Sequence, residues 1–211
     1  MKMKALLLKD WYMMWAYCRA LLVIAGVFLV VSVFGDNNMF FVCYPIVMVS
    51  MIPHSLLSYD GREKWETYSG ALPYTKTQIV EEKYVFGFFG AVVASVLCTV
   101  FQLVRIGYTG TGEWQQIGVL ALVFLTLGIL VPMLTLPFVF YFGAEKGRMV
   151  YMGGILLFCV ICPTLLNIES PAQLLALKDS RVLAWALPAA VLVLYGVSCG
   201  ISVLVYKKRE I

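Results

Sequence analysis

Charged residues and histidine are scarce in this chain. Of its 211 residues only 13% are Asp, Glu, Lys or Arg, and His54 is the single histidine. A soluble domain carries about 25% charged residues. In this chain 62% of the residues are hydrophobic. A soluble domain of the same length has no interior large enough to bury so many of them. The composition therefore excludes a water-soluble fold and indicates a membrane protein.

Motifs for catalysis and nucleotide binding are also missing. The sequence contains no Gly-x-x-x-x-Gly-Lys-Ser/Thr phosphate loop, no His/Glu zinc spacing and no Gly-x-Ser-x-Gly. Its net charge of +4 is too small to indicate nucleic-acid binding. We therefore expect a chain that is not an enzyme and has no catalytic, cofactor or metal site of its own. Any energy source would bind to another subunit.

A Cys-x-x-Cys pair raises one alternative. Cys159 and Cys162 could belong to a membrane thiol oxidoreductase or to a metal site. Both lie in an apolar run with no His, Asp or further Cys nearby to complete a site. Packing as small apolar side chains is therefore the favoured interpretation.

Six apolar segments are candidates to cross a membrane, for which a helix needs about 20 residues. They predict an all-α membrane protein with one transmembrane domain, residues 1–211. The predicted spans are residues 17–34, 39–57, 84–104, 117–142, 149–166 and 182–206.

The basic residues predict the orientation of these spans. All of the 16 Lys and Arg residues except Arg105, Lys178 and Arg181 fall on one side of the arrangement. Because basic residues concentrate in cytoplasmic loops, both termini and the segment 59–83 are predicted to be cytoplasmic. We expect a multi-pass protein of the cell membrane.

The first 15 residues are predicted to form an interfacial helix. Lys4, Lys9 and Asp10 are expected to point away from its apolar stripe, which would lie among the lipid headgroups. An inner extension of the first span is the alternative. The stripe consists of Leu6, Leu7, Trp11, Met14 and Trp15.

Three features inside the spans concern shape and packing. His54 lies near the inner end of the second span, and its polar edge is expected to reach the interface rather than to relay protons. Prolines are expected to kink their helices, either along a transport path or as ordinary bends. These prolines are Pro45, Pro53, Pro132, Pro137, Pro163 and Pro188. Small residues of the third span are expected to allow close helix contacts, namely Gly87, Gly90, Ala91, Ala94 and Ser95.

The polar segment 59–83 is predicted to contain a helix, a turn and a second helix. Trp65, Tyr68 and Leu72 have helical spacing and form an aromatic ridge that ends before Pro73. Thr75 and Gln78 are placed as a capping box, flanked by Tyr74 and Ile79 as a hydrophobic staple. A plain interfacial helix resting on lipid is the alternative.

Two groups of residues in this order resemble a known family. They are Leu6-Leu7-Leu8-Lys9-Asp10 near the start, and then Asp60, Trp65, Leu72-Pro73, Ile79-Val80 and Lys83-Tyr84. In these residues the chain resembles the permease subunits of ABC transporters of the type-2 exporter class. Among them it is most similar to small six-span permeases such as the phenol-soluble modulin and bacteriocin-immunity exporters. The stretch from Gly61 to Lys64 departs from the more acidic pattern of many relatives.

The resemblance implies a permease of the bacterial cytoplasmic membrane that exports a peptide or other amphipathic cargo. It implies two permease chains, identical or different, docked on ATPase subunits that bind ATP and Mg. The segment 59–83 would then be the coupling helix, and the N-terminal helix a second connection. A membrane scaffold or immunity protein that works without ATP remains the alternative. The implied coupling residues are Asp60, Arg62, Glu63, Trp65, Glu66, Tyr68, Leu72 and Pro73, and the implied N-terminal connecting residues are Leu7, Lys9, Asp10 and Trp11.

Overall fold

The computed structural model describes residues 2–34, 39–63, 65, 74–109, 117–143, 146 and 181–208. Its long elements are all helices, as the sequence predicts. They are α1 (Lys2–Tyr17), α2 (Arg19–Phe34), α3 (Met39–Ser50), α4 (Ile52–Arg62), α6 (Lys76–Thr109), α7 (Ile117–Phe142) and α10 (Arg181–Lys208). The predicted span 149–166, with Cys159, Cys162 and Pro163, lies outside the described residues.

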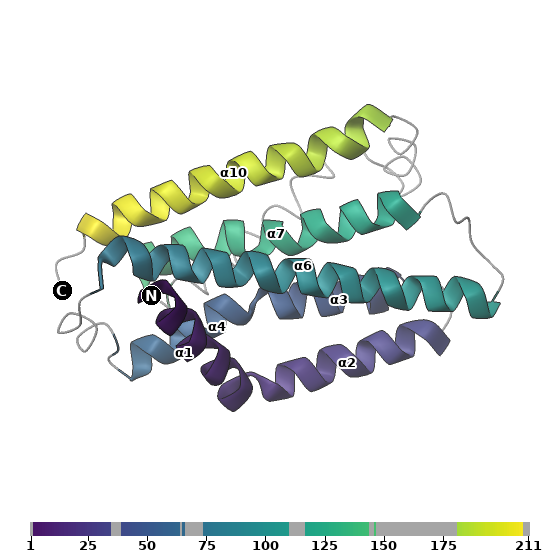
Figure 1. Cartoon of the computed structure of the whole chain (residues 1–211), viewed down its shortest axis with the longest axis horizontal. Helices are drawn as coiled ribbons and strands as arrows, with labels where there is room; N and C mark the ends of the chain where they lie inside the picture. Colours follow the sequence, from purple (N-terminus) through teal and green to yellow (C-terminus); the bar gives the residue numbers. More distant parts are fainter. Residues whose placement is uncertain are drawn as a thin grey trace.

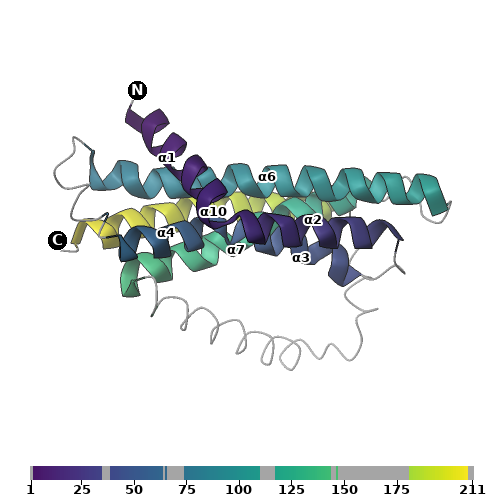
Figure 2. The same cartoon turned by 90° about the horizontal axis from the view of Figure 1, so that it is seen from below.

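The long helices form an elongated bundle with α6 and α7 near its centre (Figure 1). The helix α10 packs against α6 and α7, while α3 packs against α2, α6 and α7. The short helix α1 crosses the bundle at a steep angle (Figure 2). The end of α4, the start of α6 and the end of α10 lie at one end of the bundle, together with α1 (Figure 1). We call this the charged end.

Four helical segments of the described residues are long and apolar enough to cross a membrane: Phe41–Arg62, Lys76–Tyr108, Ile117–Phe142 and Pro188–Lys208. A fifth span results if α1 and α2, which meet at an angle of 72°, are counted as one. These helices support a multi-pass membrane protein. Six spans, and a cytoplasmic position of the charged end, remain predictions.

The helix breaks have local causes. Pro53 has no N–H to donate to the preceding turn, and the second span divides at Met51 into α3 and α4. Pro45, Pro132, Pro137 and Pro188 instead lie inside continuous helices. The expectation that His54 extends to the surface is wrong. Its side chain is buried with 6% exposure, in the first turn of α4.

The predicted capping box at the start of α6 is confirmed. The Thr75 amide donates to Gln78 Oε1 at 3.2 Å, and the Gln78 amide donates to Thr75 Oγ1 at 3.3 Å. The first turns of α6 are polar, and its apolar part begins at Tyr84, where the third span was predicted to start. At the end of α7, Gly143 has φ 84, a conformation that glycine adopts without strain.

Small residues bring the central helices close together, as the sequence predicts. A Cβ built on Gly87 would lie 3.2 Å from Pro53 Cγ and 3.3 Å from Pro132 Cβ. A Cβ on Gly128 of α7 would lie 3.0 Å from Ala91 Cβ. Large apolar side chains such as Phe34, 77% exposed, cover the outside of the helices. Such a surface is suited to lipid contact.

Candidate functional site

The buried face of α1 carries a carboxylate. Leu6, Asp10, Met14 and Cys18 are spaced by four residues, and all are at least 92% buried. Met14 and Cys18 pack against Ile52, Leu56 and Phe86 of α4 and α6. The expectation that Asp10 points away from the packed stripe is therefore wrong. The side chains that remain exposed are those of Leu8, Trp11, Tyr12 and Trp15.

Asp10 faces a lysine of α6 and an aspartate of α4. Lys83 Nζ lies 2.6 Å from Asp10 Oδ2 and 2.8 Å from Asp60 Oδ2. Lys9 Nζ lies 2.8 Å from Asp60 Oδ1 and 3.3 Å from Asp10 Oδ1. Each ammonium thus bridges both aspartates. We call these four residues, together with the adjacent Glu82, the charged cluster.

Except for Lys9, whose side chain is 21% exposed, the charged cluster is almost free of water contact. The side chains of Asp10 and Lys83 have 0% and 1% exposure, and that of Asp60 has 4%. An unpaired charge in such a place is strongly unfavourable, so the ion pairs have to be retained together. The ammonium of Lys83 is paired at both sides, since it lies 2.6 Å from Asp10 Oδ2 and 2.8 Å from Asp60 Oδ2.

Glu82 makes the charge balance of the cluster uneven. The cluster contains two lysines and three carboxyl groups, so one proton on a carboxyl group makes it neutral. Glu82 lies just before the apolar part of α6 and is 1% exposed. Its carboxyl group lies within hydrogen-bond distance of that of Asp10, so the excess negative charge of the cluster is held in a buried place, where it is unfavourable.

Three further contacts tie this region together. The Tyr17 hydroxyl donates to Glu63 Oε1 at 2.9 Å, and the Tyr17 ring stacks on Tyr59 at 4.6 Å. Lys9 Nζ lies 4.1 Å from the ring centroid of Trp65. Residues 63–75 join α4 to α6. The helix α1 contacts α4 through Asp60 and α6 through Lys83, so it is attached to the helices on both sides of this connecting segment.

A second polar contact joins the spans deeper in the bundle. The Tyr84 hydroxyl lies 2.9 Å from Ser198 Oγ and 2.7 Å from Ser202 Oγ of α10. The Tyr195 hydroxyl donates to the Tyr84 carbonyl at 2.6 Å, and Ser198 Oγ donates to the Met133 carbonyl of α7 at 2.7 Å. These bonds fix α6, α7 and α10 relative to one another next to the charged cluster.

The structure brings together some of the predicted site residues. Lys9, Asp10 and Asp60 are in the charged cluster, and Leu7 packs beside Met14 and Cys18. Trp11 remains 44% exposed. Arg62 and Glu63 are exposed at the end of α4, while Trp65 is half-buried against Lys9. Glu66, Tyr68, Leu72 and Pro73 lie outside the described residues.

Lys83 and Glu82 were missing from the predicted site set. The sequence offered one signal for them, because both charges stand directly before an apolar span. A charge that becomes buried at such a place needs a partner. Within the part of the chain that the structure describes, no three His, Cys, Asp or Glu side chains are arranged to hold a metal ion.

Comparison with known proteins gives one match. The model of the family described as "ABC-2 family transporter protein" matches residues 5–207, nearly the whole chain. No curated protein and no solved structure matches it.

Proposed function

The chain belongs to the ABC-2 family of transporter proteins, and on that premise we propose that it is a permease subunit that exports amphipathic cargo, driven by a separate ATPase. Membership of the family makes the chain a membrane subunit of an ABC transporter system. The direction of transport, the cargo and the partner chains are the proposal.

The observation that carries the proposal is the attachment of α1 to α4 and to α6, the helices that flank the connecting segment 63–75. Asp60 lies near the end of α4, and Lys83 lies in the third turn of α6. Both pair with α1, Asp60 with Lys9 and Lys83 with Asp10. A force applied to the connecting segment 63–75 would therefore move α1, α4 and α6 together. A permease needs such a rigid unit if closure of an ATPase is to change the packing of its spans.

In this proposal the segment docks on the ATPase and the charged cluster positions it. Asp60 is used inside the chain rather than at the partner surface, because both of its oxygens face lysines. The contact with the ATPase would be formed by exposed groups at the end of α4, such as Glu63, and by the predicted aromatic ridge. ATP and Mg would bind in the partner chain.

The apolar character of the spans supports the proposed cargo class, which the family resemblance suggests. The helices present large apolar side chains outward, among them Phe89, 58% exposed, and Val193, 68% exposed. Such surfaces favour an amphipathic peptide or a lipid-like molecule that enters from the membrane. A second permease chain, identical or different, would complete the transport path.

Co-purification with the ATPase tests the proposal. The double variant Trp65→Ala/Tyr68→Ala removes two residues of the ridge, and we expect it to lose the bound ATPase and peptide transport in proteoliposomes. Tyr108→Ala is the matched control, because Tyr108 is 78% exposed at the opposite end of α6. If the double variant keeps ATPase binding and transport at the level of the control, the coupling assignment is wrong.

A further inference from the structure

A groove of about 390 Å³ runs along one face of α3 and α4. Its volume is within the range of small-molecule sites, about 300–1,000 Å³. The lining residues of these two helices recur every three or four positions, so they form one continuous stripe across the break at Met51. Leu21 of α2 forms part of the opposite wall.

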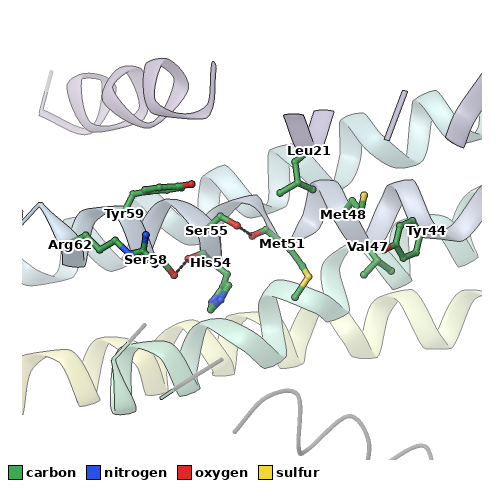
Figure 3. A pocket seen from close by; sticks show the side chains of 10 residues that line it. All are labelled: Leu21, Tyr44, Val47, Met48, Met51, His54, Ser55, Ser58, Tyr59 and Arg62. Atoms are coloured by element: carbon green, nitrogen blue, oxygen red, sulfur yellow. Dashed lines mark hydrogen bonds between the residues drawn. The ribbon is translucent and has the colours of Figure 1, made fainter. Parts of the chain in front are cut away.

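The groove changes from apolar to polar along its length. Val47 and Met48 of α3 lie toward one end, where Tyr44 contributes the one polar side chain of the lining, and Ser58, Tyr59 and Arg62 of α4 lie toward the other (Figure 3). Arg62 is exposed, and no carboxylate of the described residues lies within 4.0 Å of its guanidinium. Its neighbour Glu63 instead accepts the hydrogen bond of Tyr17.

We propose that this groove binds one anionic phospholipid of the surrounding membrane, with the phosphate at Arg62 and an acyl chain along Val47 and Met48. Arg62 is the last residue of α4 and lies at the charged end, while the apolar part of the groove extends toward the middle of the bundle. A phospholipid has the same order of charge and hydrocarbon relative to the membrane surface. Basic pockets between spans are suited to anionic headgroups.

The side chains suit each part of the lipid. A guanidinium offers forked donors that match phosphate oxygens. The Ser58 hydroxyl donates a hydrogen bond to the His54 carbonyl at 3.1 Å. Its proton is therefore used within α4, and this bond fixes the side chain in the groove wall. Met48 and Met51 are flexible and polarisable, so they adapt to an acyl chain of irregular shape. The lipid site does not rest on the proposed export function, although Arg62 is also among the implied coupling residues.

Lipid retention by the purified full-length chain, without any ATPase, tests the site. The chain is equilibrated in detergent with equal amounts of phosphatidylglycerol and phosphatidylcholine that carry the same acyl chains, and bound lipid is measured by native mass spectrometry. We expect the wild type to retain phosphatidylglycerol preferentially. Arg62→Ala should retain about fivefold less of it, the factor expected for one cation at an anionic headgroup.

Two further variants separate the site from general effects. Arg19→Ala removes another exposed arginine and should retain lipid as the wild type does. Met48→Trp should displace the lipid without changing charge, and if it fails to fold, the Arg62 variant still decides. Equal retention of the two lipids, or equal loss in both arginine variants, would overturn the assignment. If the lipid is retained by the monomer and lost whenever the chain dimerises, the groove is assigned to a second copy of the chain, which would also overturn the proposal.

Discussion

Replacing Lys83 by methionine tests the charged cluster most directly. Methionine has a similar length and no charge, so the variant keeps the packing of α6 and removes the ammonium that lies 2.6 Å from Asp10 and 2.8 Å from Asp60. Water cannot take its place, because the Lys83 side chain is only 1% exposed. One aspartate then has to remain charged without a full partner or take up a proton.

The cost follows from the titration of that aspartate. Its ordinary pKa is 3.8, so protonation at pH 7 costs about 4 kcal/mol, from the conversion of about 1.4 kcal/mol per pH unit. This agrees with the 3–5 kcal/mol that is typical when one partner of a buried ion pair is removed. At pH 5 the same protonation costs only about 2 kcal/mol. The destabilisation of Lys83→Met should therefore shrink by about half between pH 7 and pH 5.

Thermal unfolding of the chain in detergent, followed by tryptophan fluorescence, measures this difference. Lys4→Met is the matched control, since Lys4 is an exposed lysine of α1. The double variant Asp10→Asn/Lys83→Met should be less destabilised than the sum of its single changes, because the two groups interact directly. If Lys83→Met at pH 7 falls within about 1 kcal/mol of Lys4→Met, or if its loss does not depend on pH, the reasoning about the cluster is refuted.

Glu82→Gln keeps the shape of the side chain without its ionisation. Because Glu82 is 1% exposed and adds a third carboxyl group to two lysines, removing its charge should not destabilise the chain, and the unfolding temperature of the variant at pH 7 should be at least that of the wild type. A clear loss of stability in the variant would contradict this charge balance. Tyr84→Phe leaves two serine hydroxyls without their partner; a loss of about 1 kcal/mol is expected in the same unfolding assay, and no loss would show the contact to be dispensable. Gly128→Ala places a Cβ 3.0 Å from Ala91 Cβ, and overpacking should cost about 1–3 kcal/mol, whereas Gly26→Ala, with open space around it, should not destabilise; equal effects would argue against close packing there.

Local features of the fold could be predicted because their causes are close in sequence. The capping box depends on Thr75 and Gln78, three residues apart, and the helices follow from apolar runs and polar turns. Composition alone established the membrane class. The close approach at Gly87 could also be expected, because only small residues permit it.

The charged cluster could not be derived from local pattern. On α1 the position of Asp10 suggests a solvent-facing side chain, since a carboxylate is rarely buried without compensation. Its partner Lys83 is 73 residues away, and only the packing of α1 across α6 brings the two together. The contact between Tyr84 and Ser202 spans 118 residues and is hidden for the same reason.

The separation of Asp10 and Lys83 also has a consequence for how the protein is made. The helix α1 emerges from the ribosome before α6, and its buried-face carboxylate has no lysine from α6 to pair with until 73 more residues have been synthesised. At translation rates of about 5–20 residues per second this interval is about 4–15 s. During it the N-terminal helix would be held at the membrane surface by its exposed aromatic side chains, among them Trp11 and Trp15. Docking of α1 is thus a late step of membrane insertion, and arrival of the third span is the event that permits it.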